Sequence, residues 1–140
     1  MKAFTLFSLL ALAPFYQSAM ALTVKPSEVA NKIREVSLSS VRFEGQPKVV
    51  LADAKGISLY TFDLDSEGKS VCKGRCLEVW PPLNVAADAQ LVPPFGKIPG
   101  NNGKPQLTLK GLPLYYFHKD KAPGDVDGHY PDWQLIFVQD

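Results

Sequence analysis

The sequence has 140 residues, enough for one domain and too few for a large multidomain machine. Its 15 basic and 14 acidic residues give a formal charge of +1, which offers little electrostatic support for binding nucleic acid. A content of 46% hydrophobic and 21% charged residues indicates a globular core, while 12 prolines and 10 glycines favour short strands joined by turns over a helical bundle.

Residues 1–21 have the pattern of a signal peptide. Lys2 supplies the positive start, residues 3–13 form a nearly unbroken apolar run, and Ala19 and Ala21 are small residues where a signal peptidase reads the chain. The run ends at Pro14, short of the roughly 20 residues that cross a bilayer. We predict cleavage after Ala21, delivery to the periplasm or the exterior, and no membrane insertion after cleavage, since no cysteine lies nearby for lipid attachment.

Residues 22–47 are expected to form an N-terminal helix and strand. The helix is predicted over 27–36, with Ser27 as its N-cap and with Val29, Ile33 and Val36 on one face. A strand is predicted over residues 41–44. The rest of the chain, residues 48–140, reads as a tandem-repeat β domain.

An internal duplication organises this domain. Residues 56–65 and 111–120 share Gly, Leu, Tyr, Phe and Asp in register, at a spacing of 55 residues, and a tryptophan follows each copy. Repeat one is predicted over residues 48–83 and repeat two over 104–139. Residues 84–103 between them are rich in Pro, Gly and Asn and are expected to form a long irregular connection.

Alternation of apolar side chains predicts strands in both copies, covered on two sides because both faces are largely apolar. Residues 48–51 are expected to pair with 57–62, and residues 106–109 with 112–117, as two matching hairpins. A closing strand is predicted over 133–138. The expected fold class is mainly β: a small pseudo-symmetric domain of hairpins in tandem, with one short N-terminal helix.

Two Tyr-x-aromatic-x-x-Asp segments, the sequence Cys72-x3-Cys76 and the run Trp80-Pro81-Pro82 together resemble a bacterial family of secreted repeats and lipoproteins named for the Yx(FWY)xxD motif. The resemblance covers residues 49–138. It implies a secreted domain and a fold, but no activity, because the family is known as repeats of unknown function. Lipid anchoring does not carry over, since this chain lacks the cysteine for it. The family motif falls on Tyr60, Phe62, Asp65, Tyr115, Phe117 and Asp120.

The motif allows a structural and a functional interpretation. Residues i and i+2 share one face of a strand, so each Tyr and Phe can be buried together while the Asp binds backbone N–H groups of the following turn. Alternatively, the two hydroxyls and two carboxylates converge on a pseudo-twofold axis and bind a ligand between the repeats. The duplication permits both.

Cys72 and Cys76 are the two cysteines of the chain, and we expect an exported protein to join them in a disulfide. Gly74 between them suits a tight loop. A redox or haem-attachment role is less well supported, because those motifs space the cysteines by two residues. A structural zinc site needs more ligands than this segment offers, and nothing selects copper.

Acidic loops and two histidines are the remaining candidates for metal ligands. Residues 63–68 match the start of a calcium loop, but Gly74 stands where the loop needs glutamate. Solvated turn carboxylates and ordinary histidines are the alternative interpretation. The candidate ligands for calcium or a transition metal are Asp63, Asp65, Asp125, Asp127, His118 and His129.

No residue pattern predicts catalysis, since Gly-x-Ser-x-Gly is absent and both cysteines are expected to be oxidised. We expect a noncatalytic binding or scaffolding module of the cell envelope that needs no cofactor. Its partner would be an envelope protein or a small ligand, and not nucleic acid. The competing hypothesis is a small metal-binding or redox-associated periplasmic protein.

Overall fold

The computed structural model describes residues 22–139, so the predicted signal peptide lies outside the described residues. The chain is mainly β, as predicted. Its elements are β1 (Thr23–Val24), α1 (Pro26–Val29), β2 (Val36–Phe43), β3 (Gln46–Asp53), β4 (Tyr60–Phe62), α2 (Arg75–Val79), β5 (Phe95–Pro99), β6 (Pro105–Leu109), β7 (Leu112–Pro113), β8 (Trp133–Leu135) and β9 (Phe137–Val138). None of the helices in the described part is long and apolar enough to cross a membrane.

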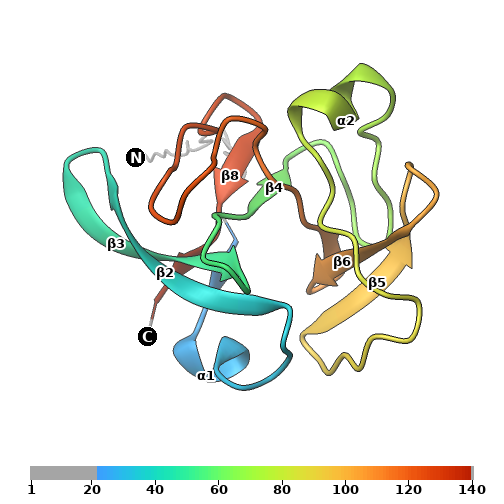
Figure 1. Ribbon diagram of the computed structural model, residues 1–140, viewed down its shortest axis with the longest axis horizontal. Coiled ribbons are helices and arrows are strands. Elements are labelled where there is room, and N and C mark those ends of the chain that lie inside the picture. Colours follow the sequence, from blue (N-terminus) through green and yellow to red (C-terminus); the bar gives the residue numbers. More distant parts are fainter. Residues whose placement is uncertain (1–21, 140) are drawn as a thin grey trace, which may run out of the picture.

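Three small sheets make up the molecule. One has the strand order β1-β9-β3-β2, a second pairs β4 with β8, and a third has the order β5-β6-β7. Figure 1 shows the β2–β3 hairpin reaching out on one side, the β5–β6 hairpin on the other side, and the β4–β8 pair between them. The two ends of the described segment are joined in the first sheet, where β1 runs parallel to β9.

Two hairpins close through turns that need left-handed backbone. Lys110 and Gly111 have φ values of 52° and 86°, and Glu44 and Gly45 have 52° and 78°. Positive φ at both central residues is the geometry of the two-residue hairpin turn, which glycine adopts without strain. The predicted hairpin around Lys110–Gly111 is therefore confirmed, with a second strand, β7, that is shorter than expected.

The first predicted hairpin is wrong in its main pairing. β3 pairs along its whole length with β2, which begins at Val36. Residues 57–62 touch β3 through the single Ala52–Ser58 bridge and two flanking hydrogen bonds, after which β4 turns away to pair with β8. The tight Glu44–Gly45 turn makes β2 the nearer partner, and short loops between strands favour that outcome.

Two further expectations about secondary structure are wrong. The helix predicted over 27–36 is the single turn α1, because the chain turns at Asn31, whose φ is +56°, and has become a strand by Val36. The expected capping residue, Ser27, lies inside the helix, and Lys25 caps it. α2 was not predicted. The connection 84–103 is not irregular throughout, since it contains β5.

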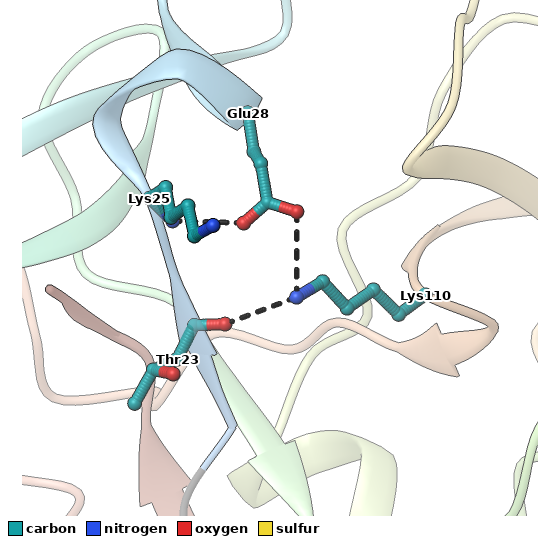
Figure 2. A network of polar contacts seen from close by, with 4 residues as sticks. All are labelled: Thr23, Lys25, Glu28 and Lys110. Carbon is teal, nitrogen blue, oxygen red and sulfur yellow. Dashed lines mark hydrogen bonds and ion pairs between the residues drawn. The ribbon is translucent and has the colours of Figure 1, made fainter. Parts of the chain in front are cut away.

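Lys110 ties the N-terminal segment to repeat two (Figure 2). Its ammonium lies 3.5 Å from Glu28 Oε2 and donates a hydrogen bond to the Thr23 carbonyl at 3.3 Å. The backbone N–H of Lys25 donates to Glu28 Oε1 at 2.8 Å. That hydrogen bond, with the positive charge of Lys110, holds the pKa of Glu28 below its usual value. The network is exposed, so we expect it to orient α1 more than to stabilise the fold.

The segment that runs from Leu59 into β4 separates two hydrophobic clusters, as strands buried on both faces do. Leu59 points into one cluster, which is mainly aliphatic and contains Leu51, Leu107 and Ile136. Tyr60, the next residue, points into the other, which is mainly aromatic. The prediction that this strand is covered on two sides is confirmed: Leu59, Tyr60 and Thr61 are all buried.

Candidate functional site

Tyr60 and Asp120 form the first of two buried tyrosine–aspartate clusters. The Tyr60 hydroxyl donates to Asp120 Oδ2 at 2.7 Å and accepts the N–H of Gly128 at 3.0 Å. The other carboxylate oxygen of Asp120 accepts the N–H of Asp127 at 2.9 Å. We call these four residues the Asp120 cluster. The tyrosine comes from repeat one, whereas the aspartate comes from repeat two.

Tyr115 and Asp65 form the second cluster with the repeats exchanged. The Tyr115 hydroxyl donates to Asp65 Oδ2 at 2.6 Å and lies 2.5 Å from Ser70 Oγ. Asp65 Oδ1 accepts the N–H of Val71 at 2.8 Å. We call these four residues the Asp65 cluster. Each repeat therefore supplies the acid for the tyrosine of the other repeat.

The two tyrosines meet at the centre of this exchange. Tyr60 and Tyr115 form an antiparallel bridge in which each N–H donates to the carbonyl of the other, at 2.8 and 2.9 Å. Both side chains are 0% exposed. The duplication thus produces a local pseudo-twofold arrangement, with one tyrosine–aspartate hydrogen bond on each side of the bridge.

Aromatic rings of the two repeats are stacked beside the clusters. Trp80 of repeat one and Trp133 of repeat two lie parallel, with ring centroids 3.8 Å apart. Phe62 stacks on Trp133 at 4.1 Å, and Phe117 lies against Trp80 at 4.7 Å. Each motif phenylalanine therefore packs on the tryptophan of the other repeat. Such contacts add to the free energy gained from burying the rings.

Burial dominates the electrostatics of the clusters. It raises the pKa of Tyr60 and of Tyr115 well above the usual value of 10.0, and the neighbouring carboxylates raise both further. Burial also raises the pKa of Asp65 and of Asp120, while the tyrosine hydroxyls act in the opposite direction. Tyr116, whose hydroxyl donates to Asp53 Oδ2 at 2.7 Å, has a raised pKa for the same reason, burial.

This geometry provides a hydrogen-bonded core and not an open site. Each motif carboxylate accepts one tyrosine hydroxyl and one backbone N–H, so both of its oxygens have a partner. The turn that follows each aspartate supplies the N–H, as the structural interpretation of the motif requires. A ligand between the repeats would have to displace these hydrogen bonds and enter a space that the stacked rings fill.

The remaining candidate metal ligands are dispersed. Asp63 accepts a hydrogen bond from Gln134, and Asp125 accepts the N–H groups of Lys121 and Ala122 within its own turn. Asp127 belongs to the Asp120 cluster through its backbone. Within residues 22–139 no group of three His, Cys, Asp or Glu side chains is placed to hold a metal ion.

The two histidines contact different aromatic rings. The His118 ring packs edge-on to Phe117 at 4.8 Å, and its buried Nδ1 has no hydrogen-bond partner among the described residues. His129 is exposed and packs edge-on to Phe43 at 5.1 Å. Among the described residues neither histidine side chain is hydrogen-bonded to Asp125 or Asp127, whose partners are backbone groups.

Cys72 and Cys76 form the predicted disulfide, with their Cα atoms 5.3 Å apart. The bond joins the start of α2 to the segment that follows the Asp65 cluster. Asn101 donates through its side-chain amide to the carbonyls of Ser70 and Cys72, both at 3.0 Å. The disulfide is thereby connected to the Asp65 cluster. The Asp120 cluster has no disulfide beside it among the described residues.

Sequence reasoning missed four residues of these networks. Ser70 and Asn101 carry no pattern that distinguishes them from loop residues. Gln106 is 0% exposed within β6 and donates to the Leu114 carbonyl at 2.9 Å, although a buried strand is expected to be apolar. Gly128 follows Asp127 in an acidic loop, and no sequence pattern predicts its contacts. A Cβ there would lie 2.7 Å from the Phe117 side chain, so the close approach requires glycine.

The β2–β3 hairpin carries two hollows on its surface. On one face a hollow of about 350 Å³ lies over the rings of Phe43 and Phe137, whose centroids are 5.4 Å apart. We call it the aromatic groove. Its lining is Phe43, Glu44, Gln46, Lys48, Phe137, Val138 and Gln139.

A second hollow, of about 560 Å³, adjoins the aromatic groove, since Lys48 and Val138 line both, and we call it the apolar groove. Residues paired across antiparallel strands share a face, so Leu38, Ser40 and Val49 line this groove while Phe43 points to the other side. The hairpin therefore offers two surfaces of different chemistry.

Comparisons with known proteins agree with the duplication. Residues 44–84 and 97–132 match a family described as a secreted repeat of unknown function. No curated protein and no solved structure matches the chain. The two matched segments contain both motifs and together span more than half of the sequence, whereas β1, α1, β2, β8 and β9 lie outside them. The chain therefore belongs to this family of secreted repeats and carries two copies of the repeat.

Proposed function

We propose that the protein is a noncatalytic binding module of the cell envelope that recognises a carbohydrate in the aromatic groove. The observation that carries this proposal is the floor of the groove. Phe43 and Phe137 are both half-buried and line the groove, with their ring planes tilted by 55° to each other. Aromatic rings that are held by packing can bind a ligand with little loss of side-chain entropy.

The rim of the groove supplies the polar half of the recognition. Gln46 and Gln139 each carry an amide that both donates and accepts hydrogen bonds, Glu44 accepts them, and Lys48 donates them. The Lys48 ammonium lies 6.0 Å from the Phe137 ring centroid. A sugar ring presents apolar C–H groups on its faces and hydroxyls around its edge, which matches an aromatic floor inside a polar rim.

The buried clusters support a noncatalytic role. Catalysis by the motif residues would need a substrate beside an accessible acid or base. Tyr60 and Tyr115 are enclosed, and their hydroxyls are already bonded to carboxylates. In this proposal the repeats have a structural role: their core holds the β2–β3 hairpin in place. Because the family is secreted, the ligand would be met outside the cytoplasm, and periplasmic or extracellular delivery through the predicted signal peptide is part of the proposal.

The competing function is a metal-binding or redox-associated protein. The unpartnered Nδ1 of His118 is the observation that favours it. However, Asp65 and Asp120 are occupied by tyrosines, and the disulfide lies beside repeat one alone. We therefore propose that no metal or cofactor is needed. Thermal unfolding of natively purified protein should be unchanged by a chelator, and stoichiometric metal that raises the melting temperature would establish the competitor.

Calorimetry with oligosaccharides released from the cell envelope tests the carbohydrate proposal. Gln46→Ala removes an exposed amide and should weaken binding about tenfold, the effect of one lost hydrogen bond of about 1.4 kcal/mol, with an unchanged melting temperature. Val49→Ala on the apolar face is the matched control and should bind normally. Absence of binding by the wild-type protein, or an equal loss in Val49→Ala, would contradict the proposal.

Substitutions in the clusters complete the test. Asp65→Asn and Asp120→Asn should lower the melting temperature and leave the affinity for oligosaccharide unchanged, because these carboxylates lie in the core. If either variant stayed fully stable and lost binding, the ligand site would lie between the repeats and the aromatic groove would be the wrong assignment.

A further inference from the structure

β2 is an edge strand with an unused side. It lies at one end of the sheet order β1-β9-β3-β2 and pairs with β3 over all eight of its residues. Among residues 22–139 no strand or bridge pairs with its other side. Figure 1 shows this hairpin extending from the body of the molecule.

The hydrogen bonds of β3 identify the groups that β2 exposes. Leu51 donates its N–H to Ile136, and its carbonyl accepts the N–H of Leu59, so neither group is directed at β2. Leu38, which lies opposite Leu51, is therefore in a pair without backbone hydrogen bonds. Such pairs alternate with bonded ones along an antiparallel ladder. Leu38, Ser40 and Arg42 consequently direct their N–H and carbonyl groups outward.

This edge lacks the protection that sheet edges usually carry. The strand has no proline, its register with β3 is uninterrupted, and Arg42 is its one charged residue. Natural sheets blunt such edges with bulges, prolines, several charges or a covering element, since an open edge recruits another strand. An eight-residue open edge is therefore a surface for strand addition.

We propose that β2 pairs with β2 of a second copy of this chain, antiparallel and about a twofold axis at Ser40. Outward-directed residues must then face one another, which places Ser40 opposite the partner's Ser40 and Leu38 opposite the partner's Arg42. The small serines at the centre let the backbones approach, and serine pairs across strands are favourable. The aliphatic part of Arg42 packs on Leu38.

Two features of the molecule favour its own copy as the occupant. The sequence of outward residues Leu38, Ser40 and Arg42 is self-complementary in this register, as a twofold interface requires. The chain without its predicted signal peptide has equal numbers of acidic and basic residues, 14 of each, so net charge does not oppose association. Pairing also joins the apolar grooves of the two copies, since Leu38 and Ser40 line both.

Sedimentation analysis of the protein from residue 22 onward tests the dimer. We expect concentration-dependent dimerisation that Ser40→Pro abolishes, because proline removes the central outward N–H. Ser40→Ala keeps that N–H and is the matched control, which should still dimerise, weakened only by the loss of the serine pair. A protein that remains monomeric at about 1 mM, or a Ser40→Pro variant that dimerises normally while folded, would overturn the proposal.

Charge substitutions test the register and do not depend on proline. Leu38→Lys places a second positive charge opposite the partner's Arg42 and should weaken the dimer about tenfold, whereas Leu38→Glu should strengthen it. The double variant Leu38→Lys with Arg42→Glu should restore wild-type dimerisation. Equal effects of Leu38→Lys and Leu38→Glu would overturn this register. Leu38 and Arg42 do not line the aromatic groove, so these results test the dimer separately from carbohydrate binding.

Discussion

The two tyrosine–aspartate clusters use the same chemistry in different surroundings. In the Asp120 cluster the carboxylate is 6% exposed, and the second partner of the Tyr60 hydroxyl is the backbone N–H of Gly128. In the Asp65 cluster the carboxylate is half-buried, and the second partner of Tyr115 is a side chain, Ser70. The Asp120 cluster therefore completes the bonding of its tyrosine hydroxyl with a backbone N–H, and the Asp65 cluster completes it with a serine side chain beside a disulfide. The difference shows that the duplication preserved the tyrosine–aspartate hydrogen bond but not the second partner of the tyrosine hydroxyl.

High pH should break both clusters together and produce the largest effect. Burial and the neighbouring carboxylates raise the pKa of Tyr60, Tyr115 and Tyr116 above their usual 10.0. Stability from a raised pKa is present below the unfolded value and is lost as pH rises above it, by about 3 kcal/mol per tyrosine at two pH units higher. Tyrosinate absorbance and circular dichroism should change together in an alkaline titration. Ionisation of these three tyrosines before unfolding would contradict their burial.

Gly128→Ala should destabilise the Asp120 cluster most among the single substitutions. The new methyl group would lie 2.7 Å from Phe117 and 2.8 Å from the Tyr60 ring. Overpacking of a well-filled core costs about 3 kcal/mol at its upper range, and denaturant titration measures this loss. Gly96→Ala is the matched control, because its methyl group would meet only Thr108 Oγ1, at 3.3 Å. Equal losses in the two variants would show that Gly128 is not a close contact.

Reduction of the disulfide should act on repeat one alone. Loop entropy for so short a ring predicts a loss of about 2 kcal/mol. Because Cys72 adjoins the segment that carries Ser70 and Val71, the Val71 amide should exchange its hydrogen faster in the reduced protein. The Asp127 amide, which is the corresponding donor in repeat two, should keep its protection. Uniform loss of protection at both amides would mean that the disulfide supports the whole fold.

Removal of each tyrosine hydroxyl should give the smallest effects and should separate the clusters. Tyr60→Phe leaves Asp120 Oδ2 and the Gly128 N–H without their partner in the core and should cost about 2 kcal/mol in unfolding free energy. Tyr115→Phe should cost about 1 kcal/mol, because water can reach the half-buried Asp65. Denaturant titration of both variants measures the difference. A larger loss of unfolding free energy for Tyr115→Phe would contradict the claim that the Asp120 cluster is the more deeply buried of the two.

The sequence predicts local and repeated features well and long-range partners poorly. The duplication, the mainly β fold, the disulfide and the Lys110–Gly111 hairpin follow from spacing and turn residues. The exchange of aspartates between repeats does not, because periodicity places Tyr60 on a face without saying which loop covers it. The pairing of β3 with β2 was missed for a similar reason: tight turns lay on both sides of β3, and sequence alone did not rank them. The short helix over Pro26–Val29 was overextended because Ile33 and Val36 also fit a helical period.

The central claim is that the motif joins the two repeats, and a double-mutant cycle between Tyr60 and Asp120 tests it most directly. Tyr60→Phe and Asp120→Ala, singly and together, should show a coupling of about 1 to 2 kcal/mol in unfolding free energy. The matched cycle of Tyr60→Phe with Asp65→Ala, two residues of the same repeat, should show a coupling near zero. Coupling within the repeat and none across it would contradict the reciprocal arrangement.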